Sequence, residues 1–182
     1  MFGVPVAPFE ELSRHFAPDD HHFFVAITYF GLNKVRARLV ELARGNGYRA
    51  ASYVSPQAFV WKNAQLGEHC FIFEQTVIQP FVTLGDDVIC WSGCFIGHHS
   101  SIGSHCFVAA HSAVNGTASV GEYSFLGANC TIANHVSVAE NCIISAGSHV
   151  MSDVERNQVI FGTWRKKTLS STSRLNSEFF LE

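Results

Sequence analysis

The sequence predicts a mainly β protein in which a parallel β-helix of hexapeptide repeats follows a small N-terminal α/β unit. Between Val54 and Val150 an apolar residue recurs at every sixth position without a slip. A small or β-branched side chain comes four residues after each of them, from Ala58 to Ser148. A six-residue period fits neither an α-helix nor a long strand, so it indicates a short strand and a turn that repeat.

Three hexads close one coil of a triangular prism, so residue n stacks on residue n+18 at the strand spacing of about 4.8 Å. One face of the prism collects outward apolar residues: Phe71, Phe73, Ile89, Trp91, Phe107, Phe125 and Ile143. Another face collects polar residues: Gln65, Thr83, Ser101, Ser119 and Ser137. An apolar patch of that size predicts a contact surface. We expect it to serve oligomerisation, and packing of the N-terminal unit is the alternative.

Residues 1–53 predict a partial, Rossmann-like α/β unit. It contains a short helix at residues 8–12, an extended run within residues 21–28, a helix with apolar residues at positions 32, 35, 39 and 42, and a second strand at residues 49–54. The unit lacks the Gly-rich loop that follows the first strand of a nucleotide-binding unit. The basic residues of the longer helix predict a solvated face rather than a phosphate site: Lys34, Arg36, Arg38 and Arg44.

The β-helix domain is predicted to span residues 54–155, followed by a C-terminal cap and tail over residues 156–182. Terminal units of stacked proteins cover the open end of the stack. Tight corners favour residues that adopt left-handed backbone conformations, glycine and asparagine above all. The corner positions that fit this rule are Asn63, Gly93, Asn129, Asn141 and Gly147.

The composition is that of a packed globular protein, because 47% of the 182 residues are hydrophobic and only 15% are charged. A net charge of −3 gives no electrostatic reason to expect nucleic acid or an anionic membrane as a partner. Neither a secretory signal nor an apolar stretch of membrane-spanning length is visible, so we expect a cytoplasmic protein. All six cysteines fall on inward positions of the hexad, which predicts core packing rather than disulfides or a metal site.

One corner combines the residues that acyl transfer requires. His98 and His99 are adjacent imidazoles, and His98 stacks beneath Gly116 of the next coil. A glycine corner leaves its backbone N–H within reach of a ligand. The imidazole can remove a proton from an attacking amine or hydroxyl, while the backbone donor holds the developing oxyanion.

These features resemble the left-handed β-helix acyltransferases, in the branch of bacterial nucleotide-sugar N-acetyltransferases and sialic acid O-acetyltransferases. The resemblance rests on the phased hexads, the strand-helix-strand lead-in and the corner at His98 and His99. It implies a homotrimer with acetyl-CoA between neighbouring prisms and no metal. It maps the catalytic base onto His98, the oxyanion amide onto Gly116, and cofactor contacts onto Gly116, Ala128 and Ala146.

The chain departs from that branch at four places. One is the usual Gly-x-Pro-Ala ending, which reads Gly162-Thr163-Trp164-Arg165 in this sequence. His99 stands where many members carry an acidic residue, and Phe107 stands where some carry a histidine. The Gly-rich unit that holds the sugar nucleotide in relatives is missing. We therefore expect either a shortened N-terminus or a different way of holding the substrate.

The resemblance implies an acetyl-CoA-dependent acetyltransferase that acts on an amino group of a nucleotide-linked deoxyamino sugar in surface-glycan biosynthesis. O-acetylation of a sugar or of sialic acid is the first alternative, and a non-catalytic trimeric scaffold is the second. A metal enzyme of the γ-carbonic anhydrase kind is disfavoured, because it needs three converging histidines and the His-x4-His pair of that family is absent from the corner histidines.

Overall fold

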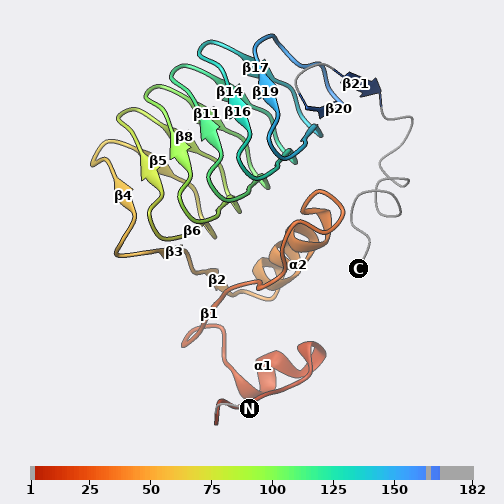
Figure 1. Ribbon diagram of the computed structural model, residues 1–182. Helices are drawn as coiled ribbons and strands as arrows, with labels where there is room; N and C mark the ends of the chain where they lie inside the picture. Colours follow the sequence, from red (N-terminus) through yellow and green to blue (C-terminus); the bar gives the residue numbers. More distant parts are fainter. Residues whose placement is uncertain (1–2, 163–164, 169–182) are drawn as a thin grey trace.

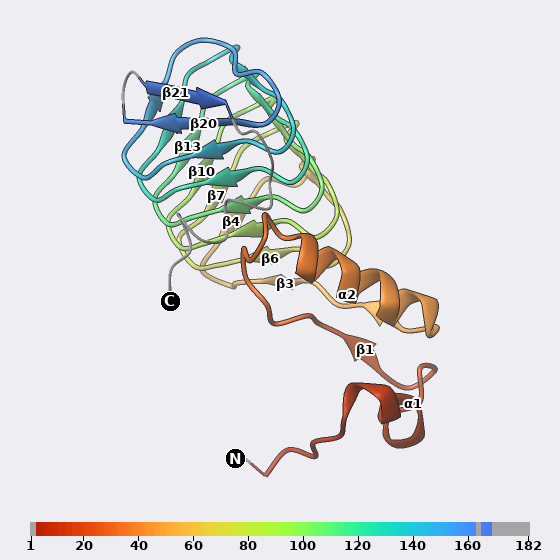
Figure 2. The same cartoon turned by 90° about the vertical axis from the view of Figure 1, so that its right-hand side faces the viewer.

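The chain folds into a triangular prism of stacked coils with the N-terminal unit along one side (Figures 1 and 2). The computed structural model describes residues 3–162 and 165–168. Each hexad contributes one two-residue strand, and the second residue of each strand is the predicted inward residue. The strands are β3 (Tyr53–Val54), β4 (Phe59–Val60), β5 (Gln65–Leu66), β6 (Phe71–Ile72), β7 (Val77–Ile78), β8 (Thr83–Leu84), β9 (Ile89–Cys90), β10 (Phe95–Ile96), β11 (Ser101–Ile102), β12 (Phe107–Val108), β13 (Ala113–Val114), β14 (Ser119–Val120), β15 (Phe125–Leu126), β16 (Thr131–Ile132), β17 (Ser137–Val138), β18 (Ile143–Ile144) and β19 (His149–Val150).

Three parallel sheets form the walls of the prism. The covered face contains β3, β6, β9, β12, β15 and β18; the open face contains β4, β7, β10, β13, β16 and β19; the serine face contains β5, β8, β11, β14 and β17. Stacked partners are eighteen residues apart, as in the pairs Phe107 with Phe125 and Ser101 with Ser119. The prediction of a mainly β, left-handed parallel β-helix of hexapeptide repeats is therefore confirmed.

The core of the prism is a column of inward side chains. Ile78, Ile96 and Ile132 are fully buried, and all six cysteines are free and buried, as the hexad predicts. Burial raises the pKa of Cys94 and of Cys106 to about 12, so neither thiol ionises readily near neutral pH. The cysteines of the described core are packing residues.

The left-handed corner position accepts more residue types than we predicted. Gly93, Asn129, Asn141 and Gly147 have positive φ as expected. Asn63 is not among the described residues with positive φ; its Oδ1 accepts the N–H of Phe81 at 3.3 Å. Five histidines occupy the same corner position at φ between 57 and 64°: His69, His99, His105, His111 and His135.

The N-terminal unit is a strand-helix-strand unit, as predicted. Its elements are η1 (Phe9–Glu11), α1 (Leu12–His15), β1 (His22–Phe23), α2 (Lys34–Gly45) and β2 (Arg49–Ala50). β1 pairs in parallel with β2. The predicted strand at residues 49–54 is divided, because β2 pairs with β1 whereas β3 begins the prism. Both views place α1 farther from the prism than α2 (Figures 1 and 2).

The buried side of α2 differs from the predicted apolar stripe. Val35 and Leu42, which the helical spacing assigns to the core, are 42% and 44% exposed. The helix instead buries small residues and one cation: Arg36, Ala37, Val40 and Ala43.

Residues 24–33, which we call the strap, lie on the covered face. Tyr29 contacts Phe107 and Phe125 with ring centroids 5.0 and 5.2 Å apart. Leu32 is 2% exposed and packs in one cluster with Ile143. The strap therefore covers part of the apolar face, as the alternative of N-terminal packing predicts, whereas Trp91 on the same face is 36% exposed.

A buried ionic network fastens the strap to the prism. Arg36 Nε donates to Asp87 Oδ1 at 2.5 Å, and the two side chains are 1% and 0% exposed. Arg36 Nη1 also donates to the carbonyls of Val25 at 2.6 Å and Ile27 at 3.3 Å. The prediction that Arg36 belongs to a solvated helix face is wrong, because its carboxylate partner lies 51 residues away in the prism.

Two histidines complete the network around Asp87. The N–H of Val25 donates to His69 Nε2 at 2.8 Å, so the ring hydrogen is on Nδ1, which donates to Asp87 Oδ1 at 2.7 Å. His105 Nδ1 lies 3.0 Å from Asp87 Oδ2. Burial alone would raise the pKa of Asp87, but the hydrogen bonds from His105 and His69 and the charge of Arg36 outweigh it and lower that pKa to about 2.

The prism continues past Val150 with a shorter repeat. Val154 bridges to Val138, and β20 (Gln158–Phe161) pairs in parallel with β18 so that Ile160 lies opposite Ile144. These partners are sixteen residues apart instead of eighteen, which explains why the six-residue rule stops there. β21 (Arg165–Thr168) pairs antiparallel with β20. The predicted tail over residues 169–182 lies outside the described residues.

Candidate functional site

His98 and Gly116 lie together at the corner between the open face and the serine face. His98 follows β10 by two residues and Gly116 follows β13 by two, so one coil separates them. A Cβ placed on Gly116 would lie 2.7 Å from both Cε1 and Nε2 of His98. The imidazole edge therefore packs directly against the glycine backbone. The predicted base and the predicted backbone donor are brought together because stacking relates residues n and n+18.

The backbone around this pair is held by neighbouring coils. The N–H of His98 donates to Gln79 Oε1 at 3.0 Å, and the carbonyl of His98 accepts the N–H of Thr117 at 2.9 Å. A Cβ on Gly97 would come within 2.6 Å of the nitrogen of Gly116, so the two coils approach as closely as they do only because Gly97 has no side chain. Within residues 3–162, the N–H of Gly116 has no hydrogen-bond partner. It remains available to an incoming oxygen.

His99 is placed beside His98 by a stacked aromatic ring. Nδ1 of His98 lies 3.2 Å from Nδ1 of His99, and the two rings are nearly perpendicular at 84°. Phe81, one coil below, stacks on His99 with centroids 4.6 Å apart. Both imidazoles are solvent exposed. We did not identify Gln79 and Phe81 from the sequence, although counting back eighteen residues from positions 97 and 99 finds them.

Two of the three predicted cofactor residues, Ala128 and Ala146, lie at a different corner. Ala128 follows β15 and Ala146 follows β18, where the covered face meets the open face. The carbonyl of Ala128 accepts the N–H of Gly147 at 2.8 Å. In the described part of the chain the N–H groups of Ala128 and Ala146 have no hydrogen-bond partner. A single chain therefore brings His98 together with Gly116 but not with Ala128 and Ala146.

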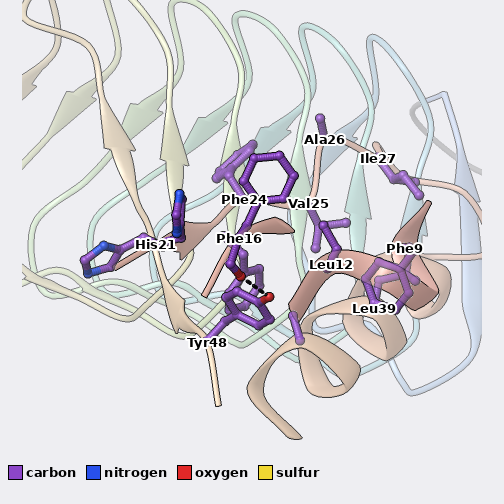
Figure 3. Close-up of a pocket in the computed structure, with 13 residues that line it drawn as sticks. Phe9, Leu12, Phe16, His21, Phe24, Val25, Ala26, Ile27, Leu39 and Tyr48 are labelled. Atoms are coloured by element: carbon purple, nitrogen blue, oxygen red, sulfur yellow. Dashed lines mark hydrogen bonds between the residues drawn. The ribbon is translucent and has the colours of Figure 1, made fainter. Parts of the chain in front are cut away.

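A cavity and a groove lie away from the corner of His98. A cavity of about 510 Å³ lies in the N-terminal unit, lined mainly by aromatic and aliphatic residues of η1, α1, β1, the strap and α2 (Figure 3). Tyr48 Oη donates to the carbonyl of Phe16 at 2.6 Å at its edge (Figure 3). A groove of about 460 Å³ runs along the serine face and includes Ser101, Ser119 and Glu122. Neither contains His98 or Gly116.

Residues 3–162 and 165–168 hold no group of three or more His, Cys, Asp and Glu side chains arranged to bind a metal ion. No helix in that part of the chain has the length and apolarity to cross a membrane.

Solved structures with this fold include sugar-modifying acetyltransferases. A point mutant of perosamine N-acetyltransferase from Caulobacter crescentus, in complex with CoA and GDP-perosamine, aligns with a TM-score of 0.82 and 28% identity over 88% of this chain and 75% of that chain. The acetyltransferase domain of PglB from Neisseria gonorrhoeae, in complex with acetyl coenzyme A, aligns with a TM-score of 0.83 and 21% identity over 93% and 80% of the two chains. WeeI from Acinetobacter baumannii aligns with a TM-score of 0.61 and 17% identity over 89% of this chain and 77% of that chain.

Sequence comparison assigns the β-helix itself. No curated protein sequence matches the chain significantly. A family profile described as "GMPPB C-terminal domain" matches residues 48–160, which include the whole prism from β3 to β19. The chain therefore belongs to the GMPPB C-terminal domain family, and its fold is the hexapeptide-repeat left-handed β-helix that the nucleotide-sugar acetyltransferases share.

Proposed function

We propose that the protein is an acetyl-CoA-dependent acetyltransferase that acts on an amino group of a nucleotide-linked deoxyamino sugar. The observation that carries this proposal is the His98 edge packed against the free backbone donor of Gly116. A structure 28% identical to this chain is an N-acetyltransferase in complex with CoA and GDP-perosamine, which supports the same class of donor and acceptor.

The residues at the corner fit the steps of acyl transfer. Acetyl-CoA supplies the acetyl group as a thioester, whose C–S bond breaks as the sugar nitrogen forms a C–N bond to the acetyl carbon. Nε2 of His98 accepts the proton that the nitrogen loses and can pass it to the departing sulfur. The N–H of Gly116 donates to the acetyl oxygen while negative charge develops on that oxygen. Removing such a donor typically raises the activation barrier by about 3–4 kcal/mol.

We further propose that the active unit is a homotrimer. His98 lies on one corner of the prism, and Ala128 and Ala146 lie on another. A neighbouring copy that sets its covered-face corner beside His98 would complete the site. The unpaired N–H groups of Ala128 and Ala146 then fit the amide carbonyls of a CoA arm between two prisms. This arrangement does not need the strap-covered face.

The test compares two histidine variants. We expect His98→Ala to lower kcat with acetyl-CoA and nucleotide-linked amino sugars by about 10²- to 10⁴-fold, because a general base is lost. CoA affinity should be unchanged. His135→Ala is the matched control, since His135 is another exposed corner histidine and contacts neither His98 nor His99 in the described network. Equal kcat in His98→Ala and wild type would refute the assignment of the base.

Two alternative functions can be separated from this one by experiment. The base and donor at the corner serve a hydroxyl as well as an amine, so O-acetylation of a sugar or sialic acid is the runner-up, and a substrate panel of amino and hydroxy sugars separates the two. A non-catalytic trimeric scaffold is the second alternative. A chain that shows no CoA binding in calorimetry at millimolar cofactor would support the scaffold.

A further inference from the structure

The two adjacent imidazoles form a pair whose hydrogen position is constrained. Nδ1 of His98 and Nδ1 of His99 are 3.2 Å apart. A hydrogen bond between two ring nitrogens requires a hydrogen on one and a lone pair on the other. Either His98 donates through Nδ1, which leaves the lone pair on its Nε2 beside Gly116, or His99 donates and the lone pair of His98 is used up.

The surroundings fix His99 more firmly than the ring of His98. His99 has a left-handed backbone with φ of 57°, its N–H donates to the carbonyl of Pro80 at 3.0 Å, and its ring stacks on Phe81. The main chain of His98 is held by Gln79 and Thr117, but its side chain has only His99 as a polar partner among the described residues. The orientation of the base therefore depends on His99.

We propose that neutral His99 is the positioning residue that holds His98 as a base by accepting a hydrogen bond from its Nδ1–H. This inference rests on the proposed acyltransferase function. Among the described residues no carboxylate lies within 4.0 Å of either ring, so the acceptor is an imidazole rather than an acid. The neighbouring coils face the pair with Gln79, Phe81 and Thr117, which do not titrate near neutral pH, and His135 is one coil further, at Thr117 Oγ1.

A pair of this kind has a distinctive dependence on pH. A proton on His98 removes the base. A proton on His99 turns its Nδ1 from an acceptor into a donor, so two N–H groups oppose each other and the ring of His98 rotates away from Gly116. Either proton inactivates the site. The acid limb of log(kcat/KM) against pH should therefore begin with a slope of 1 and steepen to 2 where both rings are protonated, whereas a base held by a carboxylate ionised throughout this range keeps a slope of 1.

Two substitutions at His99 separate positioning from packing. His99→Asn keeps an oxygen acceptor near the position of Nδ1, does not titrate, and tolerates the left-handed backbone. We expect it to keep kcat within about tenfold of wild type and to lower the acid slope to 1. His99→Ala has no acceptor and should lower kcat about 10- to 100-fold without changing CoA affinity, the range expected for a lost positioning hydrogen bond. His135→Asn, two coils along the same corner, should leave the slope at 2.

Histidine tautomers measured by ¹⁵N NMR provide a readout that does not need turnover. We expect the Nδ1–H form of His98 in wild type and in His99→Asn, and a mixture dominated by Nε2–H in His99→Ala. A slope of 1 in wild type that is unchanged in His99→Asn, or one and the same His98 tautomer in all three proteins, would overturn the proposal. If no variant and no wild-type sample turns over substrate while the tautomers shift as expected, the proposed function fails and the histidine pairing stands.

Discussion

Replacing Asp87 with asparagine tests whether the buried network fastens the strap to the prism. Asparagine is nearly isosteric and tolerates the φ of 60° at this corner. It keeps one oxygen acceptor but removes the only negative charge that compensates Arg36 among the described contacts of this cluster. The substitution therefore isolates the electrostatic part of the network.

The structure sets the size of the expected effect. The pKa of Asp87 falls from its ordinary value of 3.8 to about 2, which corresponds to roughly 2 to 2.5 kcal/mol of stabilisation of the charged form. Burial lowers the pKa of Arg36 in spite of Asp87, which taken alone would argue that the pair gains little. The pKa of Asp87 is the better measure of the stabilisation by the network, because all three donor side chains of the cluster face this carboxylate. Arg36, in contrast, also donates to backbone carbonyls. Removing one partner of a buried pair costs about 3–5 kcal/mol, and we expect about 3.

Hydrogen exchange at Val25 is the direct assay, because its N–H donates to His69 inside the network. A loss of about 3 kcal/mol should accelerate its exchange roughly 100-fold through local opening of the strap. The control is Glu140→Gln, which breaks an exposed ion pair with Arg156 (3.2 Å) and should cost less than about 1 kcal/mol. Unchanged protection of Val25 in Asp87→Asn would refute the reasoning.

Four further predictions concern acid, the site, the assembly and the strap. The folded-state pKa of Asp87 is depressed, so its contribution to stability is present above about pH 4 and is lost as pH falls through about 2; acid unfolding of wild type against Asp87→Asn, followed by circular dichroism, should converge there. Gly116→Ala should lower kcat at least tenfold with an unchanged melting temperature, because the new Cβ displaces the His98 ring, whereas Gly45→Ala, with open space around it, should leave kcat unchanged. Sedimentation at micromolar concentration should give a mass of three chains, and a persistent monomer would contradict the shared site. Phe107→Asp should release the strap, seen as faster proteolysis within residues 24–33, before it affects assembly.

Much of the candidate site could be predicted because a solenoid propagates a local rule. Once the hexads are phased, residue n must stack on n+18, and this alone places His98 under Gly116 and buries the cysteines. The same arithmetic also shows that Ala128 and Ala146 share a corner that is not the corner of His98. The same stacking rule also predicts that Phe81 and Gln79 lie next to this corner.

Docking of the N-terminal unit depended on the tertiary structure. The helical period suggested that Val35 and Leu42 face the core and that Arg36 faces water, yet the fold inverts this arrangement. The helical period indicates only which residues are apolar and buried, whereas Arg36 is buried because Asp87, the His69 carbonyl and two strap carbonyls accept its hydrogen bonds from separate parts of the chain. No repeat connects these segments, so their polar complementarity appears only when the chain is folded. The apolar face could be predicted from the sequence because its residues recur periodically. The strap that covers part of it could not, because its residues follow no period.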